Sequence, residues 1–391
     1  MNPRTGCLVA CVAVLSACGG SEDATGPSAP PKFVFDSVTV GWYYSCGLSQ
    51  GAAYCWGSNA FAKLGDGTST GRNRPAPVAG GIRFTSLSAG ASHACGLTAS
   101  GEAFCWGRNE DGEVGSGPLA GGGAATVPSR VSGGIAFTVL KAGEGHTCAL
   151  DATGAGYCWG LNEYGQLGDG TKAPRLTPTP VGGGLRFVAL SAGGMHTCGL
   201  TANGAAYCWG NNENGQLGNG TDWTSGGSAS ILTPTAVLGG LEFVMVAAGN
   251  RHSCGLTRNG AVYCWGYNYS GQLGDRTLTS ANRPQIVSRV ASVVHLSAGY
   301  NTTCAISSGG AASCWGGGPY LGDGSGDGLT IPTGQVVGVT FASIARSIDH
   351  ACGVSLVGRA YCWGSNVSGE VGDGSNLTRF RPTAVLDPTS P

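Results

Sequence analysis

Fourteen of the 17 cysteines fall into seven pairs whose members are nine or ten residues apart. In the stretch GHTCALDATGAGYCWG, residues 145–160, a histidine lies two positions before the first cysteine and Trp-Gly follows the second. These residue types support two kinds of chemistry, a metal site built from His and Cys or a disulfide across a hairpin. The pairs are Cys46 with Cys55, Cys95 with Cys105, Cys148 with Cys158, Cys198 with Cys208, Cys254 with Cys264, Cys304 with Cys314, and Cys352 with Cys362.

The spacing of these cysteines argues against zinc. Structural zinc sites join close Cys-x2-Cys pairs from two segments, whereas each pair here spans one hairpin, where opposed cysteines are too close for a tetrahedral site. We therefore expect no metal and no cofactor, and we expect the histidines to occupy a repeated structural position where they satisfy backbone groups. Five units carry this histidine, at His93, His146, His196, His252 and His350.

The register across each hairpin favours a disulfide. If Cys148 opposes Cys158, then Ala149 opposes Tyr157. The residue after the first cysteine is Gly or Ala in all seven units and its predicted partner is aromatic in six, an arrangement in which a large ring covers a small neighbour. Opposed cysteines in antiparallel strands have the Cα separation that a disulfide needs. The sequence thus predicts one disulfide within every repeat.

Two glycine-rich motifs resemble ligand sites but lack a necessary part. GQLGDG, which follows Trp-Gly, has no Gly-Lys-Ser/Thr ending, so it is not a P-loop, and we expect the preceding asparagine, such as Asn162, to cap a turn. DGSGDG, residues 323–328, offers calcium-loop oxygens at Asp323, Ser325 and Asp327. Its twelfth position is Gly334 in place of the bidentate Glu, which argues against calcium.

The elements that position these motifs repeat with a period of about 51 residues. Each unit contains four short strand-like runs, exemplified by TPTPV, LRFVALSAG, HTCGLT and AAYCWG, with glycine-rich turns between them. Four-stranded units at this spacing are typical of propeller blades, which cover both faces of every sheet. The sequence therefore predicts an all-β, seven-bladed β-propeller of four-stranded repeats.

The two ends of the repeat region depart from the regular repeat in opposite ways. The first unit lacks its own Pro-containing run, while the chain ends with RPTAVL after the seventh Trp-Gly. We therefore predict that the C-terminal strand at residues 382–386 completes the first blade and closes the ring. The predicted propeller domain spans residues 33–386, and residues 387–391 form a tail.

Composition excludes several functional classes. The 72 glycines and 41% hydrophobic residues indicate a turn-rich β protein with enough material for a large core. Charged residues make up 11% and the formal net charge is −1, so the chain lacks the basic surface with which proteins bind nucleic acids or anionic membranes. We expect no nucleic-acid partner.

The N-terminal segment has the features of an export signal. One arginine precedes an apolar stretch at about residues 8–15, which is too short to cross a bilayer as a stable helix. The tetrad LSAC, ending at Cys18, resembles the lipobox of bacterial lipoproteins, in which the cysteine is lipidated after cleavage. We expect residues 1–18 to be a lipoprotein signal peptide and residues 19–32 a flexible tether. The chain would then be exported and lipid-anchored in the bacterial cell envelope, at the outer membrane or cell surface.

Divergent loops on a repeated scaffold indicate where a partner binds. Two connections exceed the repeat length, GPLAGGGAAT and DWTSGGSASI, and the second carries Trp223, an aromatic candidate for a binding hot spot. Further candidate binding residues occupy the loops after Trp-Gly, at Phe61, Arg108, Tyr164, Tyr267 and Tyr269.

The motifs GxxHxCxL and CWGxNxxGQLGDGT, which recur along residues 33–386, resemble the repeat family of the regulator of chromosome condensation. This resemblance implies a seven-bladed propeller. The founding member's exchange activity on a small nuclear GTPase and its chromatin binding are not carried over, because export and the lack of a basic tail disfavour both. The chain is also similar in repeat architecture to the propeller-type β-lactamase inhibitors of bacteria, which bind a protein through their loop face.

The sequence favours a monomeric binding module whose propeller loops hold another protein or a surface polymer. The alternative is an enzyme, a hydrolase or lyase, with its site in the central funnel. That alternative requires carboxylates that converge in the funnel. The chain lacks a Ser-His-Asp arrangement, because His295 is the one histidine outside the repeated position and lies in the apolar run VVHLSAG, where we expect it in the core.

Overall fold

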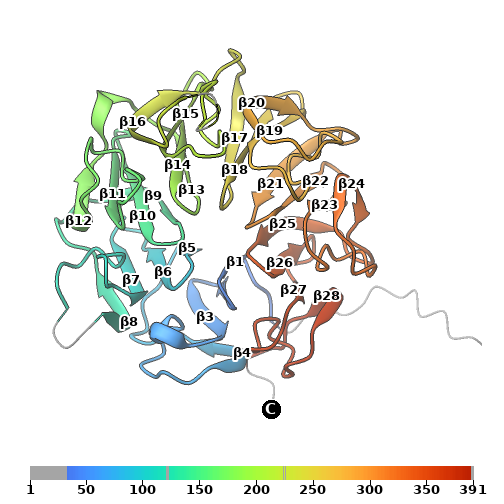
Figure 1. Ribbon diagram of the computed structural model, residues 1–391. Helices are drawn as coiled ribbons and strands as arrows, with labels where there is room; N and C mark the ends of the chain where they lie inside the picture. The colour runs from blue at the N-terminus through green and yellow to red at the C-terminus, as the bar shows by residue number, and fades with distance from the viewer. Residues whose placement is uncertain (1–32, 120–122, 223, 225, 389–391) are drawn as a thin grey trace, which may run out of the picture. The chain divides into compact units, whose positions relative to one another are not determined.

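The computed structural model describes residues 33–119, 123–222, 224 and 226–388. They form seven four-stranded antiparallel sheets, arranged as blades around a central axis (Figure 1). The predicted seven-bladed β-propeller is confirmed. The signal peptide with Cys18, the tether, the last tail residues and Trp223 lie outside the described residues. No described helix is both long enough and apolar enough to cross a membrane.

Each blade consists of four consecutive strands, from the axis outwards. The innermost strands are β1 (Ser37–Gly41), β5 (Ser86–Ala89), β9 (Phe137–Ala142), β13 (Ala189–Ala192), β17 (Phe243–Ala248), β21 (Val293–Ala298) and β25 (Phe341–Arg346). The second strands are β2 (Tyr44–Ser49), β6 (His93–Leu97), β10 (His146–Asp151), β14 (His196–Leu200), β18 (His252–Thr257), β22 (Thr302–Ser307) and β26 (His350–Ser355).

The third strands carry the Cys-Trp-Gly motif, and the outer strands carry prolines. The third strands are β3 (Ala52–Gly57), β7 (Ala103–Arg108), β11 (Gly156–Gly160), β15 (Ala206–Asn211), β19 (Val262–Gly266), β23 (Ala312–Gly316) and β27 (Ala360–Gly364). The outer strands are β4 (Arg72–Pro77), β8 (Ala124–Arg130), β12 (Arg175–Pro180), β16 (Ser230–Ala236), β20 (Ala281–Ile286), β24 (Leu329–Gln335) and β28 (Arg379–Ala384). Short 3-10 turns occur at η1 (Ala60–Ala62) and η2 (Gly182–Gly184). Proline suits an outer strand, whose free edge has no further strand to pair with.

The predicted hairpin register and cysteine pairing are confirmed. Cys148 pairs directly with Cys158, and Ala149 with Tyr157. In every blade the two cysteines lie at disulfide distance, with S–S separations from 2.03 to 2.13 Å. The ring that fills the space over the small residue is a phenylalanine at the start of the innermost strand or shortly before it, and not the predicted cross-strand aromatic. A Cβ on Gly199 would lie 2.6 Å from the ring of Phe187, which explains the small residue after the first cysteine.

The predicted closure of the ring by the C-terminal strand is wrong. Strand β28 pairs with β27 and completes the seventh blade, while the first blade contains its own β1, β2, β3 and β4. The prediction takes the Pro-containing run as the first strand of each blade, whereas in the structure this run is the last strand. The first and seventh blades join as other neighbours do, since Trp56 Nε1 donates to the Glu370 carbonyl at 2.9 Å.

Six of the seven blades are hydrogen-bonded to the preceding one through the tryptophan of their third strand. Trp209 is fully buried, and its Nε1 donates to the Gln166 carbonyl at 3.0 Å. A Cβ on Gly168, whose φ is 72°, would lie 2.6 Å from this nitrogen, so the position requires glycine. The equivalent bond between blades is made by Trp56, Trp106, Trp159, Trp265 and Trp315.

The repeated histidines bond to hydroxyl groups of the next blade, and the expectation of backbone partners is wrong. His146 Nε2 lies 2.8 Å from Thr197 Oγ1, and that hydroxyl donates to the Gln166 carbonyl. Because the hydroxyl proton is used in this way, His146 Nε2 must carry its own proton and donate, which leaves Nδ1 without a partner. The other pairs are His93 with Thr147, His196 with Ser253, His252 with Thr303 and His350 with Ser45.

We call the interface between two neighbouring blades a seam. Two seams lack both the histidine and the hydroxyl residue of this pair. Between the first and second blades the histidine position is Tyr44 and the hydroxyl position is Ala94. Tyr44 Oη donates to the His93 carbonyl at 2.6 Å. The seam thus keeps a hydrogen bond across the blades although neither member of the usual pair is present.

The seam between the sixth and seventh blades carries Thr302 and Ala351 at the same two positions. Here Arg346 is buried, and it donates to Thr302 Oγ1 at 2.7 Å and to the Tyr320 carbonyl at 2.6 Å. That carbonyl is the one that Trp363 would otherwise use, and Trp363 Nε1 has no partner among the described residues. The sixth blade has a shorter loop after Trp-Gly, and its seam with the seventh blade is held by Arg346 in place of the usual pair.

Candidate functional site

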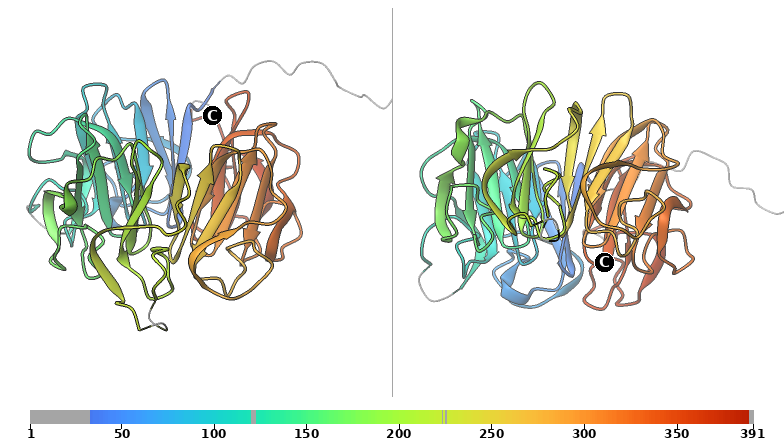
Figure 2. Two further views of the ribbon diagram at one scale, coloured as in Figure 1. Left: turned by 90° about the horizontal axis from the view of Figure 1, so that it is seen from above. Right: turned by 45° about the horizontal axis from the view of Figure 1, so that its top comes forward.

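One face of the propeller carries two sets of loops. Because strands alternate in direction within each blade, the loop from the first to the second strand and the loop from the third to the fourth emerge together. Figure 2 shows the ring from the side, with loops at both ends of the strands. We call the end that carries these two sets the funnel face, since the first set surrounds a cavity on the axis.

Seven equivalent positions form the rim of this funnel. The innermost strand of each blade ends in Gly or is followed directly by Gly, or by Ser347 in the seventh blade, and the next residue lines the cavity. These rim positions carry seven different residues, although a buried position only two residues later is conserved as histidine in five units. They are Trp42, Ala91, Glu144, Gly194, Asn250, Tyr300 and Ile348. Sequence reasoning missed them, and the signal was the divergent residue after Gly in an otherwise regular motif.

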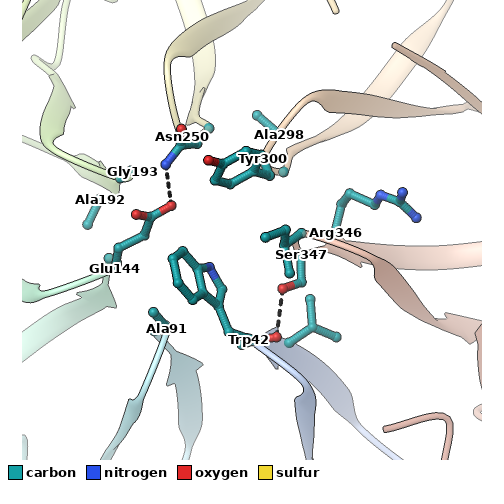
Figure 3. Close-up of a pocket in the computed structure, with 18 of the residues that line it drawn as sticks. Trp42, Ala91, Glu144, Ala192, Gly193, Asn250, Ala298, Tyr300, Arg346 and Ser347 are labelled. Carbon is teal, nitrogen blue, oxygen red and sulfur yellow. Dashed lines mark hydrogen bonds between the residues drawn. The ribbon is translucent and has the colours of Figure 1, made fainter. Parts of the chain in front are cut away.

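The rim side chains contact one another across the funnel (Figure 3). The rings of Trp42 and Tyr300 are 6.4 Å apart and meet edge to face at 71°, a favourable aromatic geometry. Opposite them, Asn250 donates a hydrogen bond to the Glu144 carboxylate. Burial raises the pKa of the Glu144 carboxyl above its ordinary value, and the hydrogen bond from Asn250 opposes that shift. The rim therefore presents an aromatic side and a polar side.

The upper part of the funnel encloses little space for a small-molecule substrate. Its volume is about 90 Å³, well below the roughly 300–1,000 Å³ of small-molecule sites. Among the described residues that line it, Glu144 alone carries a carboxylate, so the converging pair that acid-base catalysis would need does not form there. The geometry favours a surface that meets a large partner.

In six of the seven blades, one asparagine organises the loop after Trp-Gly through several hydrogen bonds. Asn162 Oδ1 accepts the Leu167 N–H at 3.0 Å, and Asn162 Nδ2 donates to Asp169 and to the carbonyls of Thr171 and Ala173. The predicted turn-capping role is confirmed for Asn162, Asn212, Asn268 and Asn366. These loops therefore hold their exposed side chains in place.

The calcium-like stretch uses its oxygens internally. Asp323 Oδ1 accepts hydrogen bonds from the N–H and hydroxyl of Ser325, and Ser325 Oγ accepts the Asp327 N–H. In the part of the chain that the structure describes, no group of three or more His, Cys, Asp or Glu residues could hold a metal ion.

The predicted binding residues that the structure describes, all but Trp223, lie on the funnel face in loops of different blades. Tyr267 and Tyr269 come together, with ring centroids 4.9 Å apart, and Tyr269 is 69% exposed. Phe61 is exposed at the tip of η1, and Tyr164 is half-buried. Arg108 forms ion pairs with three neighbouring carboxylates, so its guanidinium is engaged within its own loop.

His295 does not lie in the core. It is half-buried and lines the central channel, where its Nε2 lies 3.0 Å from the Ile344 carbonyl of the next blade. The apolar run around it was misleading, because alternate residues of an innermost strand face the channel.

Solved structures share this architecture. Prp20p of Saccharomyces cerevisiae, described with its binding properties to Gsp1p and histones, superposes with a TM-score of 0.76 at 22% identity, over 91% of this chain and 88% of that chain. Human WBSCR16 gives a TM-score of 0.73 at 20% identity, over 81% and 86% of the two chains. These likenesses concern the fold.

Sequence relatives are longer than the matched region. The ultraviolet-B receptor UVR8 of Arabidopsis thaliana is 33% identical over 265 residues, which cover 66% of this chain and 47% of UVR8. The human E3 ubiquitin-protein ligase HERC2 is 30% identical over 249 residues, 61% of this chain and 5% of HERC2. The chain therefore spans about half of the first relative and a small part of the second.

The family model for the regulator of chromosome condensation (RCC1) repeat matches residues 50–97, 100–150, 153–200, 203–256 and 259–306. A second model with the same description matches residues 84–113, 138–166, 187–216 and 243–272. The first set covers more than half of the 391 residues, so the chain belongs to the family of RCC1-repeat proteins.

Proposed function

We propose that this chain is an exported, lipid-anchored module of the bacterial cell envelope that binds another protein through its funnel face. The observation that carries the proposal is the divergence of the rim. Seven equivalent positions differ in every blade and meet around a cavity of about 90 Å³, which favours contact with a surface over enclosure of a substrate.

The chemistry of the funnel face suits a protein partner. Trp42, Tyr300, Tyr267 and Tyr269 place four aromatic rings on rigid loops, and aromatic residues are enriched at binding hot spots. The Glu144 and Asn250 pair adds polar groups that fix orientation. Prp20p is described by its binding to Gsp1p and histones, which supports a protein-binding use of the fold. A formal net charge of −1 disfavours nucleotide exchange at chromatin.

Export and anchoring rest on separate observations. Seven cysteine pairs at disulfide distance suit an oxidising compartment. The LSAC tetrad before Gly19 supports lipidation at Cys18. Replacement of Cys18 by Ser should release the chain from the membrane fraction. Retention of the C18S variant in that fraction would contradict the lipid anchor and leave the binding proposal intact.

The binding face is tested by affinity capture on intact cells with the chain that starts at Gly19. We expect one protein to be recovered by the unaltered chain and lost with Trp42→Ala and with Tyr269→Ala. The matched control is Leu356→Ala, because Leu356 is 62% exposed on a hairpin at the opposite end of the blades. Equal recovery by all variants would exclude the funnel face, and recovery of a glycan in place of a protein would assign a surface polymer.

A further inference from the structure

A second cavity lies on the axis beneath the funnel. It has a volume of about 380 Å³ and is lined by the innermost strands. Val40, Ala89, Ala192, Ala248 and Ala298 line both cavities, so the two are successive parts of one axial channel. The lower part is large enough for a small molecule, since such sites begin at roughly 300 Å³.

The ionisable residues that line the lower cavity are all basic. Lys141, His295 and Arg346 contribute basic groups, and no carboxylate is found among its described lining residues. The Arg346 guanidinium donates from Nε to Thr302 Oγ1 and from Nη1 to the Tyr320 carbonyl, so these two bonds fix its orientation while its charge still acts on the cavity. Lys141 is therefore the basic group that remains free to meet a ligand, because His295 Nε2 already lies 3.0 Å from the Ile344 carbonyl.

A group of hydroxyls surrounds the same space. Each accepts a backbone N–H from the next blade, and none of them donates a hydrogen bond within the described residues. Each hydroxyl proton thus remains available to a ligand in the channel. The four bonds run from the N–H of Ala89 to Thr39 at 3.1 Å, and at 2.9 Å from Ala142 to Ser88, from Ala248 to Ser191 and from Arg346 to Ser297.

Lys141 occupies in the third blade the position that Thr39, Ser88, Ser191 and Ser297 occupy in theirs. Within the described residues, its Nζ has no hydrogen-bond or ion-pair partner. The Lys141 side chain is exposed to the channel, and the protein around it lowers its pKa by desolvation. The pKa of His295 is lowered by burial and also by the charge of Lys141. An anion bound beside Lys141 would offset the desolvation of its ammonium group.

We propose that the lower channel binds a tetrahedral oxyanion, the phosphate or sulfate group of a small molecule. Lys141 supplies the charge, and hydroxyl donors from several blades approach from different directions around the axis, which suits a tetrahedral group with several acceptor oxygens. A planar carboxylate is bound best by a free guanidinium fork, and the one guanidinium in the described lining is engaged elsewhere.

The test is isothermal titration of the full chain with inorganic phosphate, inorganic sulfate and acetate. We expect phosphate or sulfate to bind more tightly than acetate, and Lys141→Met to weaken that binding at least tenfold. The matched control is Lys172→Met, which removes an equal charge from an exposed loop and should leave the affinity unchanged.

Ser297→Ala keeps the lysine and removes one donor, so it should weaken binding severalfold even if Lys141→Met failed to fold. Thermal melts of each variant identify any loss of folding. Failure of the unaltered chain to bind either oxyanion, equal affinity of the Lys141→Met variant, or binding of acetate as tight as that of phosphate would overturn the proposal.

Discussion

The seams between blades and the rim of the funnel lie two residues apart along the chain and follow opposite rules. At the seam, His146 and its counterparts recur because each must meet a hydroxyl of the next blade in a fully buried site. At the rim, the residue two positions earlier differs in all seven blades. Packing between blades restricts the first position and leaves the second free, so the rim is where the repeats could diverge for binding.

The two exceptional seams sharpen this comparison. Where the hydroxyl is replaced by Ala94 or Ala351, the histidine is replaced too, by Tyr44 or Thr302. A buried histidine without its acceptor would leave a donor unsatisfied, which costs about 1–3 kcal/mol. The joint replacement shows that the pair, and not either residue alone, is what the seam requires.

Acidification should produce the largest effect on the seams. Burial lowers the pKa of His146 and His252 to about 4, and that of His93 and His196 to about 3. The unfolded chain takes up protons near pH 6.5 and the folded chain does not, so stability is complete above that pH and declines as the pH falls towards 4. Each histidine contributes about 1.4 kcal/mol per pH unit in this window.

Urea unfolding measured between pH 7 and pH 5 checks this expectation. The unfolding free energy should fall with pH, and less steeply when one buried histidine has been replaced. A pH-independent free energy of unfolding would contradict neutral, buried histidines at the seams.

Truncation of a seam tryptophan should be nearly as costly, while truncation at the rim should cost little. Trp209→Ala removes a fully buried ring and one of the two hydrogen bonds that the Gln166 carbonyl accepts, so we expect a loss of about 3–5 kcal/mol in urea unfolding. Tyr269→Ala, at a 69% exposed side chain on the funnel face, should change stability by less than about 0.5 kcal/mol. Similar losses for the two variants would remove the distinction between the two regions.

The requirement for a matched pair at the seam can be tested by changing the His146 and Thr197 pair into the Tyr and Ala found at the first seam. Thr197→Ala alone leaves His146 Nε2 without an acceptor and should cost about 1–3 kcal/mol. Adding His146→Tyr recreates the Tyr44 and Ala94 arrangement of the first seam. In a double-mutant cycle the combined loss should be smaller than the sum of the single losses by at least about 0.5 kcal/mol. Simple additivity would show that the pairing is incidental.

The smallest expected effect is a difference in unfolding free energy between two glycine substitutions in one loop. It distinguishes the cost of backbone conformation from the cost of packing. Gly168 and Gly170 both have positive φ, at 72° and 82°, but only at Gly168 would a Cβ collide with Trp209. Gly170→Ala should therefore cost about 1–2 kcal/mol for its conformation, and Gly168→Ala more than that. Chemical denaturation of the two variants measures the packing contribution directly, and equal losses would mean that Trp209 moves aside freely.

Local pairing was readable from the sequence because it depends on few residues. Cys148 and Cys158 are joined by a short hairpin, and the alternation of strand side chains fixes which residues oppose each other. The number of blades followed from the repeats of Cys-Trp-Gly. The roles of Asn162 and its counterparts followed from the turn chemistry of asparagine.

The sequence by itself thus determined the fold class, the blade count, the register of each hairpin and the cysteine pairs, because all of these arise within one repeat. Only the tertiary structure decided which strand begins a blade, how the ring closes, and which residues meet at the seams, the rim and the channel. A repeat length of about 51 residues does not show at which residue one blade ends and the next begins. The ring contact between Trp42 and Tyr300 and the electrostatic influence of Lys141 on His295 each join separate blades, and both exist only once the ring has closed.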